Sequence, residues 1–177
     1  MRYVGFLRGI NVGGNHKLPM SELKNCLKEI GLENIKTLLN SGNFLFETKQ
    51  KNLKSLESKI ETHLEEIFKF PVPTILVARD EIKNLINEKP FQKIKIHNDI
   101  RLYISFLKEE SKVKIDLPYY STDKTFQIIS VQNRIISSVL DLSITKTPKG
   151  MEELEKIFGK NITTRNWNTI LKLNGFD

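Results

Sequence analysis

The sequence contains one cysteine, Cys26, among 177 residues. A single cysteine excludes an internal disulfide and fits a reducing compartment, so we expect a cytoplasmic protein. The three histidines, at positions 16, 63 and 97, are far apart and share no zinc-ligand spacing with Cys26. The sequence therefore predicts no metal site.

Long apolar runs are also absent. No stretch approaches the ~20 apolar residues that a membrane-spanning helix needs, so we expect no membrane association. The N-terminal MRYVGFLRGINVGG has too short an apolar stretch for a signal peptide and is typical of a first strand. With 39% hydrophobic and 28% charged residues and no low-complexity tract, the composition is that of a globular protein, not of a disordered or membrane chain.

The charge balance is basic. There are 28 Lys and Arg residues against 21 Asp and Glu, which gives a net charge of +7. The lysines are dispersed rather than clustered, so the excess does not by itself mark a binding surface. A chain of this length suits one domain or two small halves that share a core, and it excludes a large multidomain enzyme.

The first half of the chain alternates strand and helix patterns. Apolar residues at helical spacing predict helices near 19–30 and over 53–68, with Pro19 in the first turn of the earlier helix and Gly31 after its last turn. Continuous apolar or β-rich runs predict strands at 3–7, 35–39, 44–47 and 74–78. The resulting order, β-α-β-β-α-β, is that of a ferredoxin-like half.

The second half has the same kinds of element in a less regular order. We expect strands at 100–107, 126–131 and 134–140, and helices capped by Asp80, along 151–158 and through about 164–173. The predicted domains are residues 1–78, a ferredoxin-like half, and residues 79–177, a second α/β half with C-terminal helices. The predicted fold class is α+β, with two ferredoxin-like halves that form one compact unit.

A glycine-rich loop follows the first strand. Arg8, Gly9, Asn11, Gly13 and Gly14 precede a helix, and glycines let backbone N–H groups turn toward an anion while a helix N-terminus favours negative charge. Neither phosphate-binding fingerprint is complete: after Gly14 comes Asn15 instead of the lysine of a P-loop, and no G-x-G-x-x-G is present. We predict an anion-binding loop to which Lys17 adds charge. A connection that needs only positive φ angles is the structural alternative.

Two further segments carry polar side chains in turns. Asn40, Ser41, Gly42 and Asn43 separate two strands, and Asn43 is a candidate ligand contact, although these residues are also the ones that a tight turn selects. Near the C-terminus the sequence is ITTRNWNT.

In that C-terminal segment we predict Thr163 as a helix N-cap and a hydrophobic staple between Ile162 and Trp167. A cation in a first helical turn opposes the helix dipole, so Arg165 and Asn166 are predicted to face an anion. A salt bridge from Arg165 to a carboxylate elsewhere is the alternative.

No catalytic arrangement follows from the residues. There is no Gly-x-Ser-x-Gly elbow, Cys26 lies on the flank of an apolar helix face, and His63 lies at the edge of another. The sequence identifies no catalytic residue, cofactor or oligomeric state.

Three stretches, LRGINVGGNHKLPM at 7–20, NSGNFLFE at 40–47 and TTRNWNT at 163–169, resemble the bacterial family catalogued as domain of unknown function 1697. Asn15 stands where members often carry a lysine. The resemblance implies a compact α/β fold of two related ferredoxin-like units and no activity. The positions that match the family's motifs are Arg8, Gly9, Asn11, Gly13, Gly14, Ser41, Gly42, Asn43, Arg165, Asn166 and Trp167.

These observations favour a protein that binds a phosphate-bearing or other anionic ligand at the glycine-rich loop and the start of the last helix. A phosphate-bearing small molecule or a nucleic acid is the expected partner. The alternatives are a small-molecule enzyme of unidentified reaction, with the motif loops converging on one cleft, and a structural or protein-interaction module. The binding hypothesis requires Arg8 and Arg165 to be neighbours.

If nucleic acid is the partner, binding should weaken steeply with salt, because Lys and Arg release counterions from the phosphates that they contact. Fluorescence anisotropy of a labelled single-stranded oligonucleotide, measured between about 50 and 200 mM salt, tests this. Tight binding that is unchanged over that range would exclude a mainly electrostatic nucleic-acid contact.

Overall fold

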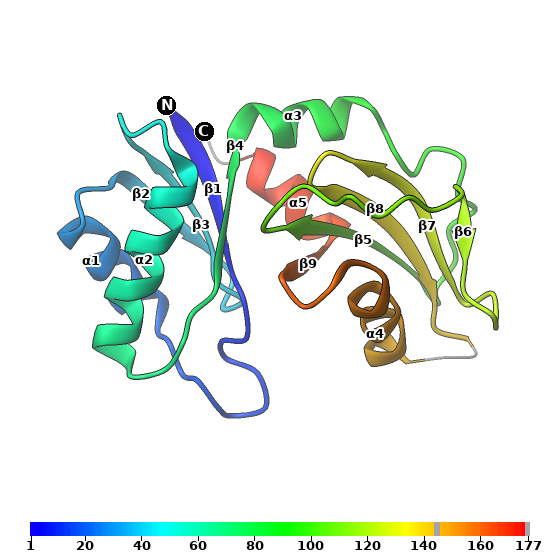
Figure 1. Ribbon diagram of the computed structural model, residues 1–177, viewed down its shortest axis with the longest axis horizontal. Coiled ribbons are helices and arrows are strands. Elements are labelled where there is room, and N and C mark those ends of the chain that lie inside the picture. Colours follow the sequence, from blue (N-terminus) through cyan, green and yellow to red (C-terminus); the bar gives the residue numbers. More distant parts are fainter. Residues whose placement is uncertain (144–145, 176–177) are drawn as a thin grey trace. The chain divides into compact units, whose positions relative to one another are not determined.

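The computed structural model describes residues 1–143 and 146–175, and its fold is α+β with two antiparallel sheets (Figure 1). The chain divides into two compact units, Met1–Ile82 (unit 1) and Lys83–Asp177 (unit 2). This division lies inside helix α3, Arg79–Asn87. Asp80 lies within the first turn of α3, so the predicted capping role of Asp80 is wrong.

Unit 1 has the predicted β-α-β-β-α-β order. Its elements are β1 (Arg2–Leu7), α1 (Met20–Glu29), β2 (Glu33–Leu38), β3 (Asn43–Glu47), α2 (Leu53–Phe68) and β4 (Thr74–Ala78). The strands lie in the order β2-β3-β1-β4 and every pair is antiparallel. Helices α1 and α2 cover one face of this sheet (Figure 1). Pro19 is the N-cap of α1 and not part of its first turn.

Unit 2 repeats this strand order with a different crossover. Its elements after α3 are β5 (Ile100–Leu107), β6 (Tyr119–Tyr120), β7 (Phe126–Gln132), β8 (Ile135–Asp141), α4 (Thr147–Phe158), β9 (Ile162–Asn166) and α5 (Trp167–Asn174). The sheet order is β6-β7-β8-β5-β9. Its last four strands, β7-β8-β5-β9, follow the same order as β2-β3-β1-β4 of unit 1. The short strand β6 and irregular chain stand between β5 and β7, where unit 1 has α1.

Each sheet has its own apolar core. In unit 1 the helix residues Leu23, Leu27, Leu56 and Ile60 pack on the sheet, and Phe44 is fully buried. Gly5 lies opposite Phe44, and a Cβ at Gly5 would stand 2.1 Å from the phenyl ring, so this strand position requires glycine. In unit 2, Leu154 of α4 packs against apolar residues of β5, β7, β8 and β9.

The outer edge of β4 is bound by carboxylates. The N–H groups of Thr74, Leu76 and Ala78 donate to Glu61, Glu57 and Glu81, at 2.8, 2.8 and 3.1 Å. Glu57 and Glu61 are spaced i, i+4 on α2, so both carboxylates reach the same strand edge. Because an edge strand otherwise leaves these donors open to another strand, the carboxylates both close the sheet and hold α2 on it.

Substitution of Glu57 by alanine should destabilise the protein by about 1.5–3 kcal/mol, because a buried N–H group loses a charge-assisted hydrogen bond. Glu57→Gln keeps an acceptor oxygen and should cost less. Urea unfolding followed by circular dichroism measures both changes. Glu65→Ala, an exposed change on the same helix, is the control and should stay within about 0.5 kcal/mol of the parent. Equal stability of the Glu57→Ala and Glu65→Ala proteins would contradict this role.

Candidate functional site

The glycine-rich loop of unit 1 is a small closed turn. The N–H of Asn11 donates to the His16 carbonyl at 3.1 Å and the N–H of Asn15 donates to the Val12 carbonyl at 3.2 Å. Gly9, Gly13 and Gly14 have φ angles of +72°, +61° and +81°, which favour glycine. A Cβ at any of these three glycines would meet nothing within 4 Å, so the backbone conformation and not crowding explains them.

The side chain of Asn11 holds this loop together. Asn11 Nδ2 donates to the Leu18 carbonyl at 2.9 Å and to the Asn40 carbonyl at 2.8 Å, and Asn11 Oδ1 accepts from the Leu18 N–H at 2.9 Å. Asn40 belongs to the turn between β2 and β3. The N–H of Leu7 also donates to the Gly42 carbonyl, at 2.8 Å. The two motif segments at 7–20 and 40–47 therefore meet at one end of the first sheet.

Asn43 also makes contacts within this turn. Its side chain is fully buried, and Nδ2 donates to the Leu38 carbonyl and to Ser41 Oγ, both at 2.9 Å. The carboxamide therefore closes the turn between β2 and β3. These contacts are those of the structural alternative that the turn sequence offered.

The charged residues of the loop have different environments. Arg8 is half-buried and Lys17 is exposed. The His16 ring stacks on Phe70 with centroids 4.5 Å apart, and His16 Nδ1 lies 3.1 Å from the Gly9 carbonyl. His16 thus fixes the loop against the segment that follows α2. Arg165 and Asn166 lie in unit 2, so the proximity of Arg8 and Arg165 stays a prediction.

The C-terminal motif begins as a strand. The prediction that the last helix starts at about residue 164 is therefore wrong, because residues 164–166 belong to the strand. Residues Ile162–Asn166 form β9, which pairs with β5, and α5 begins at Trp167. Thr163 lies opposite Phe106 in the sheet and caps no helix. The N-cap is Asn166, whose Oδ1 accepts from the Asn168 N–H at 2.9 Å. Two adjacent β-branched threonines favour a strand at 162–166. This strand also pairs with the edge of β5 that β8 does not occupy.

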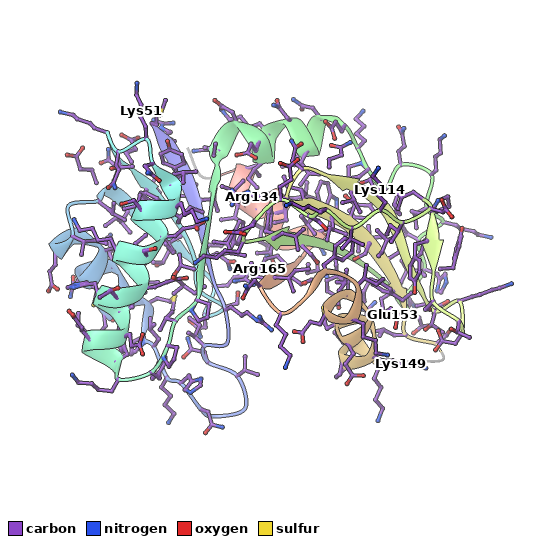
Figure 2. All side chains as sticks on the ribbon, in the orientation of Figure 1. Lys51, Lys114, Arg134, Lys149, Glu153 and Arg165 are labelled. Carbon is purple, nitrogen blue, oxygen red and sulfur yellow. The ribbon has the colours of Figure 1, made fainter. Side chains whose placement is uncertain are left out.

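Arg165 is consequently a strand residue, and the helix-dipole argument for an anion beside it does not apply (Figure 2). Its side chain is half-buried. Arg165 Nη1 donates to Thr163 Oγ1 at 2.8 Å and to the Thr164 carbonyl at 2.9 Å. Burial lowers the pKa of the Arg165 guanidinium to about 10, so it remains a cation at neutral pH.

A pocket of about 780 Å³ lies in unit 2 at the start of α5. This volume is within the range of small-molecule sites, about 300–1,000 Å³. Its lining comes from α3 and the segment after it, from the start of β5, from the last residue of β9 and from α5. The lining residues are Ile86, Lys89, Phe91, Gln92, Ile96, Ile100, Arg101, Leu102, Asn166, Trp167, Asn168 and Leu171.

An aromatic pair belongs to the pocket lining. The rings of Phe91 and Trp167 meet edge to face, with centroids 5.2 Å apart and planes at 72°. Trp167 packs against Phe91. The predicted hydrophobic staple between Ile162 and Trp167 is wrong, because Ile162 lies in β9 and not directly before the N-cap of α5. Two large apolar residues of the lining, Ile96 and Leu171, are 66% and 42% exposed. Exposed apolar surface inside a hollow is typical of a place where a ligand or partner binds.

Polar groups complete the lining. Arg101 Nη1 donates to the carbonyls of Asn98 and Ile100, at 2.6 and 3.1 Å, which orients the guanidinium. Lys89 contributes a second cation. The lining residues include no carboxylate, histidine, cysteine or hydroxyl side chain within the described chain. The charged side chains of the lining are therefore the two cations, Arg101 and Lys89.

Sequence reasoning selected Asn166 but missed the other pocket residues. Phe91 and Ile96 lie in 90–99, a lysine-bearing segment between the helix predicted after Asp80 and the strand predicted at 100–107. The apolar residues within that connection were the available signal. The sequence identified Trp167 as a motif position but assigned it no contact with a ligand.

Asn11→Gly should destabilise unit 1 by about 1–2 kcal/mol and speed hydrogen exchange in residues 11–18, because glycine tolerates the φ angle of +54° but loses three hydrogen bonds of the carboxamide. Hydrogen–deuterium exchange mass spectrometry and urea unfolding measure these effects. Asn15→Ala in the same exposed loop is the control. Unchanged exchange in Asn11→Gly would show that the loop closes without the carboxamide.

None of the described helices is long and apolar enough to cross a membrane. No curated protein matches the chain. Among solved structures, the chain is similar to the conserved bacterial protein SP0830 from Streptococcus pneumoniae, with a TM-score of 0.72 and 23% sequence identity over 98% of this chain and 97% of that one. At that identity the likeness shows a shared fold.

The sequence also matches the model of a family described as protein of unknown function (DUF1697) over residues 1–130. The matched range includes the first two motif stretches, and the third lies beyond it. Because the match spans well over half of the 177 residues, the chain belongs to the DUF1697 family.

Proposed function

We propose that this protein binds a small organic anion with a flat apolar body in the unit 2 pocket. The observation that carries the proposal is the combination of the Phe91–Trp167 pair with two cations, Lys89 and Arg101, in one hollow of about 780 Å³. A nucleotide or an aromatic carboxylate has both parts of this chemistry. Asn166, which the sequence predicts to face an anion at the start of the last helix, lines this pocket.

Aromatic and apolar side chains supply the affinity for the body of such a ligand. Burial of a planar ring against Trp167, Ile96 and Leu171 removes apolar surface from water, at about 25 cal/mol per Å². The exposed fractions of Ile96 and Leu171 mean that this surface meets solvent when the pocket holds no ligand.

The cations select the charge of the ligand. An arginine side chain has five N–H donors. Among the described residues, Arg101 donates hydrogen bonds from Nη1 to two backbone carbonyls, which leaves Nε and Nη2 for an incoming oxyanion. Lys89 is exposed and flexible and acts as a point charge beside the site. Asn166 and Asn168 add side-chain amides at the first turn of α5.

We propose the glycine-rich loop as an anion-binding surface of unit 1 in its own right. Arg8 and Lys17, with Gly9, Gly13 and Gly14, stay the predicted contacts there, and Asn11 and Asn43 support the loop and the neighbouring turn. We also propose that both units are ferredoxin-like halves, which the shared β2-β3-β1-β4 and β7-β8-β5-β9 orders support. The single cysteine supports a cytoplasmic location.

Trp167 is the only tryptophan, so its fluorescence reports on this pocket directly. Titration with adenosine monophosphate should change the emission saturably. Adenosine, which lacks the anion, and inorganic phosphate, which lacks the flat body, should bind more weakly. Benzoate tests whether an anion without phosphate is accepted. No saturable change with any of these probes would overturn the proposal.

Lys89→Ala should weaken adenosine monophosphate binding about tenfold, which corresponds to about 1.4 kcal/mol, through loss of a cation from the site. Lys93→Ala is the matched control, because Lys93 is an exposed lysine of the same segment and does not belong to the lining. Equal affinity of the two variants would remove Lys89 from the binding role.

A further inference from the structure

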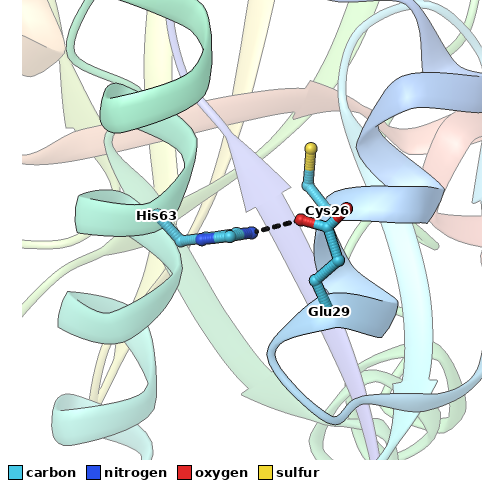
Figure 3. Close-up of side chains that lie close together, drawn as sticks. All are labelled: Cys26, Glu29 and His63. Atoms are coloured by element: carbon cyan, nitrogen blue, oxygen red, sulfur yellow. Dashed lines mark hydrogen bonds and ion pairs between the residues drawn. The ribbon is translucent and has the colours of Figure 1, made fainter.

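Cys26, Glu29 and His63 converge between the two helices of unit 1. Cys26 and Glu29 are spaced i, i+3 on α1, and His63 faces them from α2 (Figure 3). One Cys26, one Glu29 and one His63 ligand atom all lie within 4.8 Å of one another. Because the contributing helices are separated in sequence by β2 and β3, the cluster has no spacing that sequence reasoning could detect.

These donors are of the types that bind zinc. A thiolate, an imidazole nitrogen and a carboxylate oxygen bind Zn²⁺ at about 2.0–2.3 Å, so tetrahedral ligands stand about 3.5 Å apart. His63 Nε2 and Glu29 Oε2 are already 3.0 Å apart. Contraction of the remaining separations to a tetrahedral site needs movements of about 1 Å, which side-chain rotation supplies.

The exposed fraction of the three side chains increases from Cys26 through His63 to Glu29, so one end of the cluster is buried and the other is open to solvent. Cys26 is 5% exposed and lies in the unit 1 core, whereas the side chains of His63 and Glu29 are 24% and 59% exposed. A metal ion can therefore approach from the Glu29 side and meet the thiol at the inner end. A shallow hollow of about 380 Å³, lined in part by His63, Lys59 and Glu66, lies beside the cluster and leaves room for a fourth ligand.

Two carboxylates of α1, those of Glu29 and Glu22, act on the Cys26 thiol. Burial first, and then the nearby Glu29 carboxylate, raise the pKa of the Cys26 thiol. Glu22 of α1 acts in the same direction. The closest cation of α2 in this hollow, Lys59, donates from Nζ to the Ile30 carbonyl at 3.0 Å. A divalent cation would balance both the thiolate and the Glu29 carboxylate.

We propose that Cys26, Glu29 and His63 form a binding site for one zinc-like divalent metal ion, with an open fourth position. On binding, the proton between His63 Nε2 and Glu29 Oε2 moves through water to His63 Nδ1, and the ion takes the freed lone pair of Nε2 and a Glu29 carboxylate oxygen. The Cys26 thiol releases its proton to water as the metal–sulfur bond forms. Such a three-ligand site with one open position is the arrangement that leaves a metal-bound water or substrate exchangeable.

Cobalt(II) is the probe for this site, because a thiolate–cobalt bond gives a charge-transfer absorption in the near ultraviolet. Chelator-treated full-length protein should bind one Co²⁺ per chain with this absorption, and Zn²⁺ should displace it. Zn²⁺ should also protect Cys26, the only thiol, from a thiol reagent. Cobalt binding without the charge-transfer absorption would overturn the proposal, as would the absence of binding.

His63→Gln should weaken cobalt and zinc binding by about tenfold or more, because removal of even an outer-shell partner of a metal ligand costs 10–100-fold. His97→Gln, at an exposed histidine of unit 2, is the control. Cys26→Ser should abolish the charge-transfer absorption. If this variant fails to fold because the position is buried, Glu29→Gln, at an exposed position, tests the site in its place. Equal affinity of His63→Gln and His97→Gln would overturn the site. Trp167 fluorescence with adenosine monophosphate is a separate readout in unit 2, so failure of one proposal leaves the other measurable.

Discussion

The carboxylates along the outer edge of β4 are the constraint on which unit 1 depends. An antiparallel sheet with a free edge exposes a row of backbone donors, and Glu57, Glu61 and Glu81 accept from three of them. Glu57 is buried, so its carboxylate is satisfied by the strand rather than by water. This arrangement fixes the rotation of α2 about its own axis.

The fixed rotation has a consequence on the opposite flank of α2. At 100° per residue, Leu56, Ile60 and Leu64 point into the core, Glu57 and Glu61 fall on the β4 side, and His63 falls on the other side. His63 therefore meets α1, where Glu29 and Cys26 lie. The same helix thus closes the sheet edge and presents an imidazole to a thiol and a carboxylate.

Motif residues in this protein mostly hold turns, and the pocket that we propose to bind a ligand lies at the C-terminal motif. The carboxamide of Asn11 binds the Leu18 carbonyl and the Asn40 carbonyl of the neighbouring turn, and that of Asn43 binds the Leu38 carbonyl and the Ser41 hydroxyl. Asn166 caps α5 and at the same time lines the pocket, and Trp167 presents its ring there. A motif that shapes the backbone would in this way position the proposed ligand-binding surface without all of its members touching the ligand.

Local patterns determined most of the elements. The strands 74–78 and 100–107 and the helix 53–68 have the bounds that apolar spacing predicts, because each of these segments buries one face or both faces regardless of its partners. The failure at 162–166 has a definite cause. A threonine before a helical pattern is a good N-cap by itself, but pairing with β5 supplies Ile162–Asn166 with backbone partners that a helix start lacks.

The sequence by itself therefore determined the α+β class, the order of elements in unit 1 and the candidate loops, since these follow from spacing along the chain. Only the tertiary structure decided which side chains meet. The trio at Cys26, Glu29 and His63 depends on the packing of two helices, and the pocket joins the segment after α3 to the start of α5, more than seventy residues later. Such meetings depend on strand order and helix rotation, which are set by long-range hydrogen bonds and core packing and leave no fixed spacing in the chain.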